Sequence, residues 1–301
     1  MSDHDTRAPL QDRRTFLTTL GGAAIAASGL GALACASNSQ PATMPGANKQ
    51  QPAFGPVGVQ LYTVRDEMKK DVAATLARVA GIGYREVEFA GYFGRSPADI
   101  RALLDADGLT SPSAHIPIEM LRKDLAGAIA AAKVIGHQYI TVPYLDASLR
   151  TSLDDWKGLA RELNGFGGQV SREGLKLAYH NHDFEFTPMG GQVPYDVLLA
   201  ETDPALVSME MDLYWTTKAG QSPLAYFAKY PGRFRMVHLK DSKGAPQHEM
   251  TSVGNGSIDW RQIFAHRTQA GIEHFFVEHD QPADAFASIS DSYKYLSTLA
   301  L

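Results

Sequence analysis

Two histidines and two carboxylates recur at comparable intervals in the second half of the chain, each at the end of a short apolar run. They are His180, Asp212, His238 and Glu278, with separations of 32, 26 and 40 residues. Two imidazoles and two carboxylates suit a divalent ion such as Mn²⁺, Co²⁺, Fe²⁺ or Zn²⁺. Taken singly, each residue could instead be a satisfied polar group, a helix cap or the partner of an arginine. Together they predict a metal centre, provided that the fold brings the four side chains together.

The elements that must position these residues alternate between strand and helix. From Pro56 to Leu301 there are 246 residues, with eight strand-like runs that are each followed by a helical pattern. A repeat of about 31 residues matches a strand–helix unit, and the series predicts an α/β fold, a (β/α)8 TIM barrel. An open doubly wound sheet is the alternative, but no G-x-G-x-x-G follows any run. The expected strands are 57–62, 84–89, 109–115, 138–143, 175–180, 206–212, 234–238 and 274–278, and the expected helices are 68–82, 97–105, 119–135, 153–172, 194–201, 223–230, 258–270 and 283–299.

In such a barrel the active site lies at the C-terminal ends of the strands, so polar and aromatic residues there are candidates for substrate binding. The candidates at or just after strand ends are Gln60, Tyr62, Glu88, His115, Trp215 and Lys240. Aromatic rings could stack on a sugar, although core packing is the alternative for any single ring. Lys240 could equally be a solvated surface residue.

The composition excludes several classes of protein. The 301 residues include 28 basic and 33 acidic ones, which gives a net charge of −5. There is no basic excess to bind a phosphate backbone, so a nucleic acid is not an expected partner. The single cysteine excludes an internal disulfide framework and a zinc site built from cysteines.

Residues 1–35 are predicted to be a cleaved export signal of the twin-arginine type, which needs the twin-arginine export machinery and leads to a periplasmic or exported protein. Arg13 and Arg14 precede Phe16 and Leu17, and a weakly apolar run follows. Cleavage before Cys35 leaves two alternatives open, simple secretion and a lipid anchor on that cysteine. Residues 36–55 are predicted to be a flexible linker, and 56–301 the catalytic barrel, a single domain.

Six motifs cover nearly the whole predicted barrel. They are Gly58–Asp66 (GVQLYTVRD), Tyr179–Phe186 (YHNHDFEF), Met211–Trp215 (MDLYW), Val237–Asp241 (VHLKD), Val253–Trp260 (VGNGSIDW) and Phe276–Asp280 (FVEHD). Through them the chain resembles the sugar phosphate isomerase/epimerase family, the xylose isomerase-like barrels. That family includes ketose 3-epimerases, inosose dehydratases and hydroxypyruvate isomerases. The chain also resembles exported members from bacterial sugar-degradation clusters, some of which act on 3-keto-glycosides.

The resemblance implies one divalent metal ion, with Mn²⁺ expected first, held by residues from four neighbouring strands. Asp212, His238 and Glu278 match three of the family's ligands. His180 stands where most relatives have a Glu that often doubles as one of two acid/base groups. Trp215 stands where ketose epimerases commonly have a substrate-binding His. A symmetrical two-glutamate epimerase mechanism is therefore not expected.

The chemistry that these parts predict is removal of a proton next to the carbonyl of a keto sugar, with the ion stabilising the enediolate. Glu278 is the first candidate for the base, and His182 for the second proton carrier. An extended Tyr179–Phe186 segment would put His182 on the metal side and turn Glu185 away, so Glu185 ranks lower. Lys240 is expected to bind the enediolate or a substrate hydroxyl.

The predicted function is a divalent-metal-dependent isomerase, epimerase or lyase that acts on a keto sugar or a 3-keto-glycoside. The missing Glu favours elimination, which needs a base and a leaving-group acid instead of two matched bases. No basic cluster marks a phosphate pocket, so we expect an unphosphorylated sugar or glycoside as substrate. A non-catalytic, exported sugar-binding barrel is the alternative, and a phosphodiesterase related to endonuclease IV is a more distant one. Because such barrels often dimerise, a homodimer is a further expectation.

Overall fold

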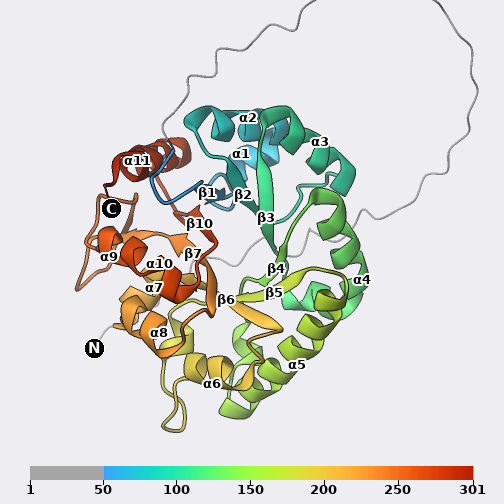
Figure 1. Cartoon of the computed structure of the whole chain (residues 1–301), viewed down its shortest axis with the longest axis vertical. Helices are drawn as coiled ribbons and strands as arrows, with labels where there is room; N and C mark the ends of the chain where they lie inside the picture. The colour runs from blue at the N-terminus through green and yellow to red at the C-terminus, as the bar shows by residue number, and fades with distance from the viewer. Residues whose placement is uncertain (1–50, 301) are drawn as a thin grey trace, which may run out of the picture. The chain divides into compact units, whose positions relative to one another are not determined.

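The computed structural model describes residues 51–300, which form a closed barrel of eight parallel strands surrounded by helices (Figure 1). Consecutive barrel strands pair with one another, and β1 pairs with β10 to close the ring. The barrel strands are β1 (Gly58–Gln60), β2 (Glu86–Phe89), β3 (Thr110–His115), β4 (Tyr139–Val142), β5 (Lys176–His180), β6 (Val207–Asp212), β7 (Phe234–Leu239) and β10 (His274–Val277). The predicted TIM barrel is confirmed.

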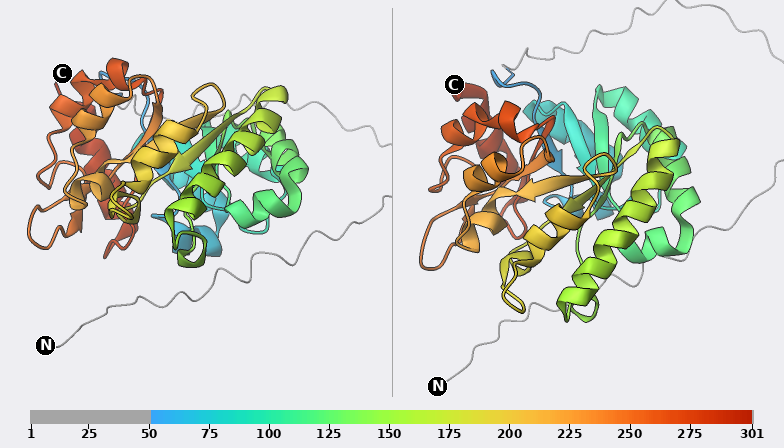
Figure 2. Two further views of the ribbon diagram at one scale, coloured as in Figure 1. Left: turned by 90° about the horizontal axis from the view of Figure 1, so that it is seen from below. Right: turned by 60° about the horizontal axis from the view of Figure 1, so that its bottom comes forward.

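The helices lie on the outside of the ring, and Figure 2 shows α5 and α6 side by side along the strands. Ser96 and Ser152 begin two of them with capping boxes, in which an aspartate three residues on returns the hydrogen bond. The predicted helix 258–270 is instead two short helices that meet at His266. The helices are α1 (Arg65–Lys70), α2 (Val72–Ile82), α3 (Pro97–Asp107), α4 (Ile118–Ile135), α5 (Leu153–Arg172), α6 (Pro194–Glu201), α7 (Leu213–Lys218), α8 (Pro223–Lys229), α9 (Trp260–Ala265), α10 (Arg267–Ala270) and α11 (Ala285–Thr298).

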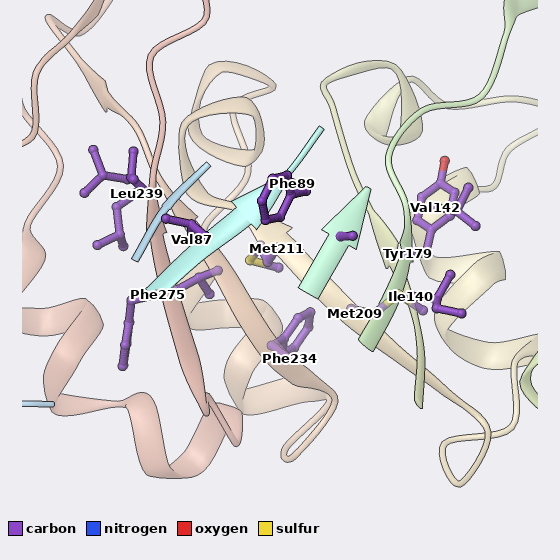
Figure 3. Packing of buried hydrophobic residues seen from close by; sticks show 14 of the residues in the cluster. Val87, Phe89, Ile140, Val142, Tyr179, Met209, Met211, Phe234, Leu239 and Phe275 are labelled. Carbon is purple, nitrogen blue, oxygen red and sulfur yellow. The ribbon is translucent and has the colours of Figure 1, made fainter. Parts of the chain in front are cut away.

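Alternation along the strands places one set of side chains between the strands and the helices and the other set inside the barrel. Val87 and Met211 belong to the large apolar cluster that packs the strands against the helices (Figure 3). A separate buried cluster consists of Tyr139, Ala178, Met236 and Phe276. Two residues further along the chain from each of these are Thr141, His180, His238 and Glu278. Because side chains two residues apart share a face, the barrel interior changes from apolar to polar toward the C-terminal ends of the strands.

The last residues of the predicted linker pack on the barrel. The ring of Phe54 stacks on that of Phe264 with 3.8 Å between centroids, and Gln51 donates hydrogen bonds to the Gly83 carbonyl and the Tyr293 hydroxyl. These contacts place residues 51–55 with the barrel. The predicted export signal 1–35, with Cys35, and linker residues 36–50 lie outside the described residues. Within residues 51–300, no helix combines the length and the apolar character that crossing a bilayer requires.

The buried carboxylate of Asp241 joins two of the sequence motifs. Asp241 lies two residues after the end of β7 and begins the short strand β8 (Asp241–Ser242). This strand pairs antiparallel with β9 (Met250–Thr251). The carboxylate accepts hydrogen bonds at 2.8–3.2 Å from the backbone N–H groups of Ser242, Gly254, Gly256 and Ile258 and from the indole of Trp260. A side chain at position 256 would collide with this carboxylate, so a glycine is required there. Asp241 thus fixes the Val253–Trp260 motif against the end of β7.

Replacing Asp241 with Asn is expected to lower the free energy of unfolding by about 3 kcal/mol, because an amide NH₂ would then face N–H donors. Urea denaturation of the purified variant measures this change. Asp154→Asn, at an exposed position in the first turn of α5, is the matched control and should stay within about 0.5 kcal/mol of the wild type. Equal stability of the two variants would contradict the role given to Asp241.

Candidate functional site

Asp212, His238 and Glu278 meet at the C-terminal end of the barrel. Asp212 ends β6, His238 is the penultimate residue of β7, and Glu278 follows β10 directly. Nδ1 of His238 lies 2.7 Å from Oε2 of Glu278, and one ligand atom from each residue falls within 4.8 Å of the others. One imidazole and two carboxylates form a donor set for a divalent ion. We call these three residues the rim trio.

Lys240 inserts its ammonium group among the carboxylates of the rim trio. Its Nζ atom lies 2.9 Å from Oδ2 of Asp212, 2.7 Å from Oε2 of Glu278 and 2.8 Å from Oδ1 of Asp280. Burial alone would lower the pKa of Lys240, but the three carboxylates raise it well above its ordinary value. Lys240 is therefore a fixed cation, which shares Asp212 and Glu278 with any ion that the trio binds.

The protonation of the rim trio follows from its neighbours. Burial would raise the pKa of Glu278, but Lys240 and His238 hold it well below its usual range. Burial would lower the pKa of His238, but Glu210 and Glu278 raise it well above its usual value. Burial raises the pKa of Asp212 to about 6, against the opposing effect of Lys240. The carboxylates thus draw protons and positive charge to this end of the barrel.

His180, the predicted fourth ligand, borders the rim trio at the end of β5. Its Nε2 atom lies 3.8 Å from Oδ2 of Asp212, and its ring centroid lies 4.4 Å from that of His238. Its Nδ1 atom lies 3.1 Å from Oε2 of Glu210. Burial and the neighbouring His238 lower the pKa of His180 to about 3, so the ring is neutral, as a metal ligand must be. One nitrogen faces the trio and the other faces a deeper carboxylate.

That deeper carboxylate, Glu210, was not among the predicted site residues. Its Oε2 atom lies 2.7 Å from Nε2 of His115 and 3.3 Å from Nε2 of His238. Glu88 lies beside it, with its Oε2 atom 2.8 Å from the same nitrogen of His238. Burial and repulsion from Glu210 raise the pKa of Glu88. The sequence signal is the spacing, since Glu210 stands two residues before Asp212 and both acids face the barrel interior.

Three predicted substrate-binding residues belong to this interior network. Gln60 donates a hydrogen bond of 2.8 Å from Nε2 to Oε2 of Glu88, and both residues are 0% exposed. Nε2 of His115 lies 3.2 Å from the same oxygen, and its side chain is 9% exposed. Gln60 and Glu88 therefore support the rim from inside the barrel. Direct contact of these residues with a substrate stays a prediction.

An aromatic wall of Tyr144, His182, Phe184 and Trp215 stands beside the rim trio. The ring centroid of His182 lies 5.3–5.5 Å from each of the other three. Nζ of Lys240 lies 5.8 Å from the centroid of Trp215. Nδ1 of His182 and Nε1 of Trp215 are buried and have no hydrogen-bond partner within residues 51–300. Such rings, with polar atoms left to pair, suit the faces and hydroxyl groups of a sugar.

Tyr62, the remaining predicted substrate-binding residue, lies just past β1. The guanidinium carbon of Arg65 lies 4.1 Å from its ring centroid. Nη1 of Arg65 donates hydrogen bonds of 2.8 Å to the carbonyls of Tyr62 and Asp280. These bonds tie the segment after β1 to the segment after β10, whose Asp280 also contacts Lys240.

The segment after β5 is not extended, so that expectation was wrong. The strand ends at His180, and Phe184–Phe186 forms the short 3₁₀ helix η3. Glu185 is buried and accepts hydrogen bonds of 2.8 Å from the Tyr179 hydroxyl and from the backbone N–H of His182. Burial raises the pKa of Glu185 to about 8. These hydrogen bonds stabilise a turn where an extended strand was expected. They also fix the backbone at His182.

Residues 76–297 match the family described as the xylose isomerase-like TIM barrel. Because this range spans most of the chain, the protein belongs to that family, and the predicted resemblance is confirmed. An inosose dehydratase from Lacticaseibacillus casei is 26% identical over 254 residues, which cover 71% of this chain and 85% of the relative. An inosose dehydratase from Clostridium beijerinckii is 30% identical over 127 residues, 37% of this chain and 42% of the relative.

Two solved structures of similar fold also come from sugar-processing barrels or share the barrel fold. A sugar phosphate isomerase/epimerase from Parabacteroides distasonis has a TM-score of 0.72 at 28% identity, with 81% of this chain and 98% of that chain covered. The IolI protein, whose structure holds a zinc atom, has a TM-score of 0.62 at 14% identity, with coverages of 80% and 96%. The second likeness concerns the fold alone.

Replacing Lys240 with Met is expected to tighten the binding of Mn²⁺ or Co²⁺ by about tenfold, because the ammonium group no longer competes for Asp212 and Glu278. Titration calorimetry measures the change. Lys218→Met is the matched control, since Lys218 lies 4.3 Å from the Trp215 ring but contacts Asp183 and not the trio. Unchanged or weaker ion binding by the Lys240 variant would contradict the competition.

Proposed function

We propose that this chain is a divalent-metal-dependent, sugar-modifying enzyme of the lyase type, which eliminates a substituent from a keto sugar or a 3-keto-glycoside. The observation that carries the proposal is the rim trio with Lys240, buried at the end of the barrel where TIM barrels have their active sites. Relatives named inosose dehydratase and neighbours named sugar phosphate isomerase/epimerase support a sugar-like ketone as the substrate.

The rim trio fits a divalent ion because its nitrogen and oxygen donors converge from three strands, and Asp212, His238 and Glu278 would hold the ion. We propose Mn²⁺, with Co²⁺, Fe²⁺ and Zn²⁺ as alternatives; when bound, it supplies a Lewis acid that polarises the substrate carbonyl. Lys240 brings a fixed positive charge and N–H donors to an oxygen that gains negative charge. The aromatic wall offers a face to the sugar ring.

Elimination needs a base for the proton next to the carbonyl. His182 is our candidate, because Nδ1 has no hydrogen-bond partner among the described residues. Burial and the neighbouring His180 hold the ring's pKa well below its usual value, so the ring is neutral and Nδ1 is free of a proton. Glu278 was the first candidate from the sequence, but both His238 and Lys240 lie 2.7 Å from its Oε2 atom. We therefore rank it second as a base.

The proposed step is written for a glycoside with its carbonyl at C3. His182 takes the proton from C2, and the electrons of that C–H bond form a double bond between C1 and C2. The bond from C1 to the leaving oxygen breaks with its electron pair, and that oxygen takes up the proton that His182 removed. Return of the first proton to a ring carbon would instead give an epimer or an isomer.

The test is turnover of a p-nitrophenyl 3-keto-glucoside, an inosose and a free ketose by metal-loaded protein. We expect release of nitrophenol, with kcat about 10²–10⁴-fold lower in His182→Phe. Glu173→Gln, at a half-exposed surface pair with Lys133, is the control and should match the wild type.

Two outcomes would contradict the lyase proposal. Recovery of an epimerised or isomerised sugar with its C1 substituent intact would replace the lyase with an isomerase or epimerase. Sugar binding without turnover in the presence of any of the four ions would leave the non-catalytic sugar-binding barrel.

We also propose that the protein is exported through the twin-arginine machinery to the periplasm, as the Arg13-Arg14 pair indicates. Changing both arginines to lysine is expected to retain the protein in the cytoplasm, as cell fractionation and immunoblotting would measure. Periplasmic recovery of the double variant at the wild-type level would contradict this route. If Cys35 carries a lipid anchor, the wild type is found in the membrane fraction and the Cys35→Ser variant in the soluble periplasmic fraction. If the protein is simply secreted, the wild type and the Cys35→Ser variant fractionate alike.

A further inference from the structure

Four side chains deeper in the barrel converge from four strands. They are His115 of β3, His180 of β5, Glu210 of β6 and His238 of β7, and one ligand atom from each lies within 4.8 Å of the others. Oε2 of Glu210 lies 2.7 Å from Nε2 of His115, 3.1 Å from Nδ1 of His180 and 3.3 Å from Nε2 of His238. We call this group the deep cluster.

The donor set of the deep cluster is typical of a transition-metal site. Three imidazoles with one carboxylate favour Zn²⁺, Co²⁺ or Fe²⁺ over Mg²⁺ or Ca²⁺. Glu88 adds a second carboxylate beside His115. The other oxygens of these carboxylates, Oε1 of Glu88 and Oε1 of Glu210, are buried without a hydrogen-bond partner in the part of the chain that the structure describes. Two buried carboxylates in this state cost free energy, which a bound cation would offset.

The deep cluster and the rim trio use different nitrogens of His238. Nδ1 lies 2.7 Å from Oε2 of Glu278 at the rim, whereas Nε2 lies 2.8 Å from Oε2 of Glu88. With Nδ1 directed to the rim, the Nε2–H group can donate to Glu88, which fixes the orientation of the ring. His115, His180 and Glu210 then remain as three ligands, the number in metal sites that keep one open position.

We propose that the deep cluster is a second binding site for a divalent transition-metal ion, with His115, His180 and Glu210 as its ligands. The site goes beyond the proposed function, because none of its three ligands belongs to the rim trio, although His238 borders both groups. A cation here neutralises Glu88 and Glu210 and links β3, β5 and β6 across the barrel interior.

Metal content after saturation with Co²⁺ and dialysis tests the proposal. We expect about two ions per chain in the wild type and about one in Glu210→Gln, His115→Gln or Asp212→Asn. The Co²⁺ absorption of the imidazole-rich site should be missing from the first two variants only. Glu86→Gln is the matched control, because Glu86 is another carboxylate of the barrel interior, paired with His274 at 3.0 Å, and should keep both ions.

The pattern of loss separates the two sites. One ion in the wild type, removed by Asp212→Asn and retained by Glu210→Gln and His115→Gln, would overturn the deep site and leave the proposed function intact. One ion removed by Glu210→Gln and His115→Gln but retained by Asp212→Asn would uphold the deep site and remove the rim centre on which the proposed function rests. Absence of any bound ion would overturn both. Should Glu210→Gln not fold by circular dichroism, His115→Gln decides the matter.

Discussion

Carboxylates inside a barrel are stable only where positive charge lies beside them. Glu88, Glu210, Asp212 and Glu278 are each at most 6% exposed, and the groups that neutralise them are imidazoles and the single ammonium of Lys240. The same need for positive charge makes this end of the barrel suitable for a metal ion. Chemistry and stability therefore depend on one balance of charge.

The rest of the fold shields these charged side chains from water. Apolar side chains between strands and helices supply the main core, which frees the interior-facing positions near the C-terminal strand ends for polar residues. At the end of β7, one residue contributes to the site and the next stabilises the fold. Lys240 turns toward the rim carboxylates, while the next residue, Asp241, binds the backbone of the Val253–Trp260 loop. Adjacent side chains with opposite directions thus serve the site and the scaffold.

The sequence was sufficient to predict the barrel, and it placed Asp212, His238 and Glu278 together at the ends of neighbouring strands, because these residue types recur at one per strand–helix unit. Metal binding by these three residues, with His180 as the predicted fourth ligand, stays a prediction. Glu210 was not predicted because it stands before the end of its strand, although its spacing of two residues from Asp212 puts both acids on one face. The turn at Phe184–Phe186 escaped prediction because buried hydrogen bonds to Glu185 override the alternating pattern. The contact of Lys240 with three carboxylates depends on side-chain directions from several strands, which spacing alone does not specify.

We propose that the rim trio is a metal centre at which Lys240 and the ion share carboxylates. Anomalous diffraction from crystals saturated with Mn²⁺ or Co²⁺ tests it most directly. We expect an anomalous peak among Asp212, His238 and Glu278, with the Lys240 ammonium withdrawn toward Asp280. Saturated crystals without a peak at the trio, and with Lys240 still between Asp212 and Glu278, would contradict it.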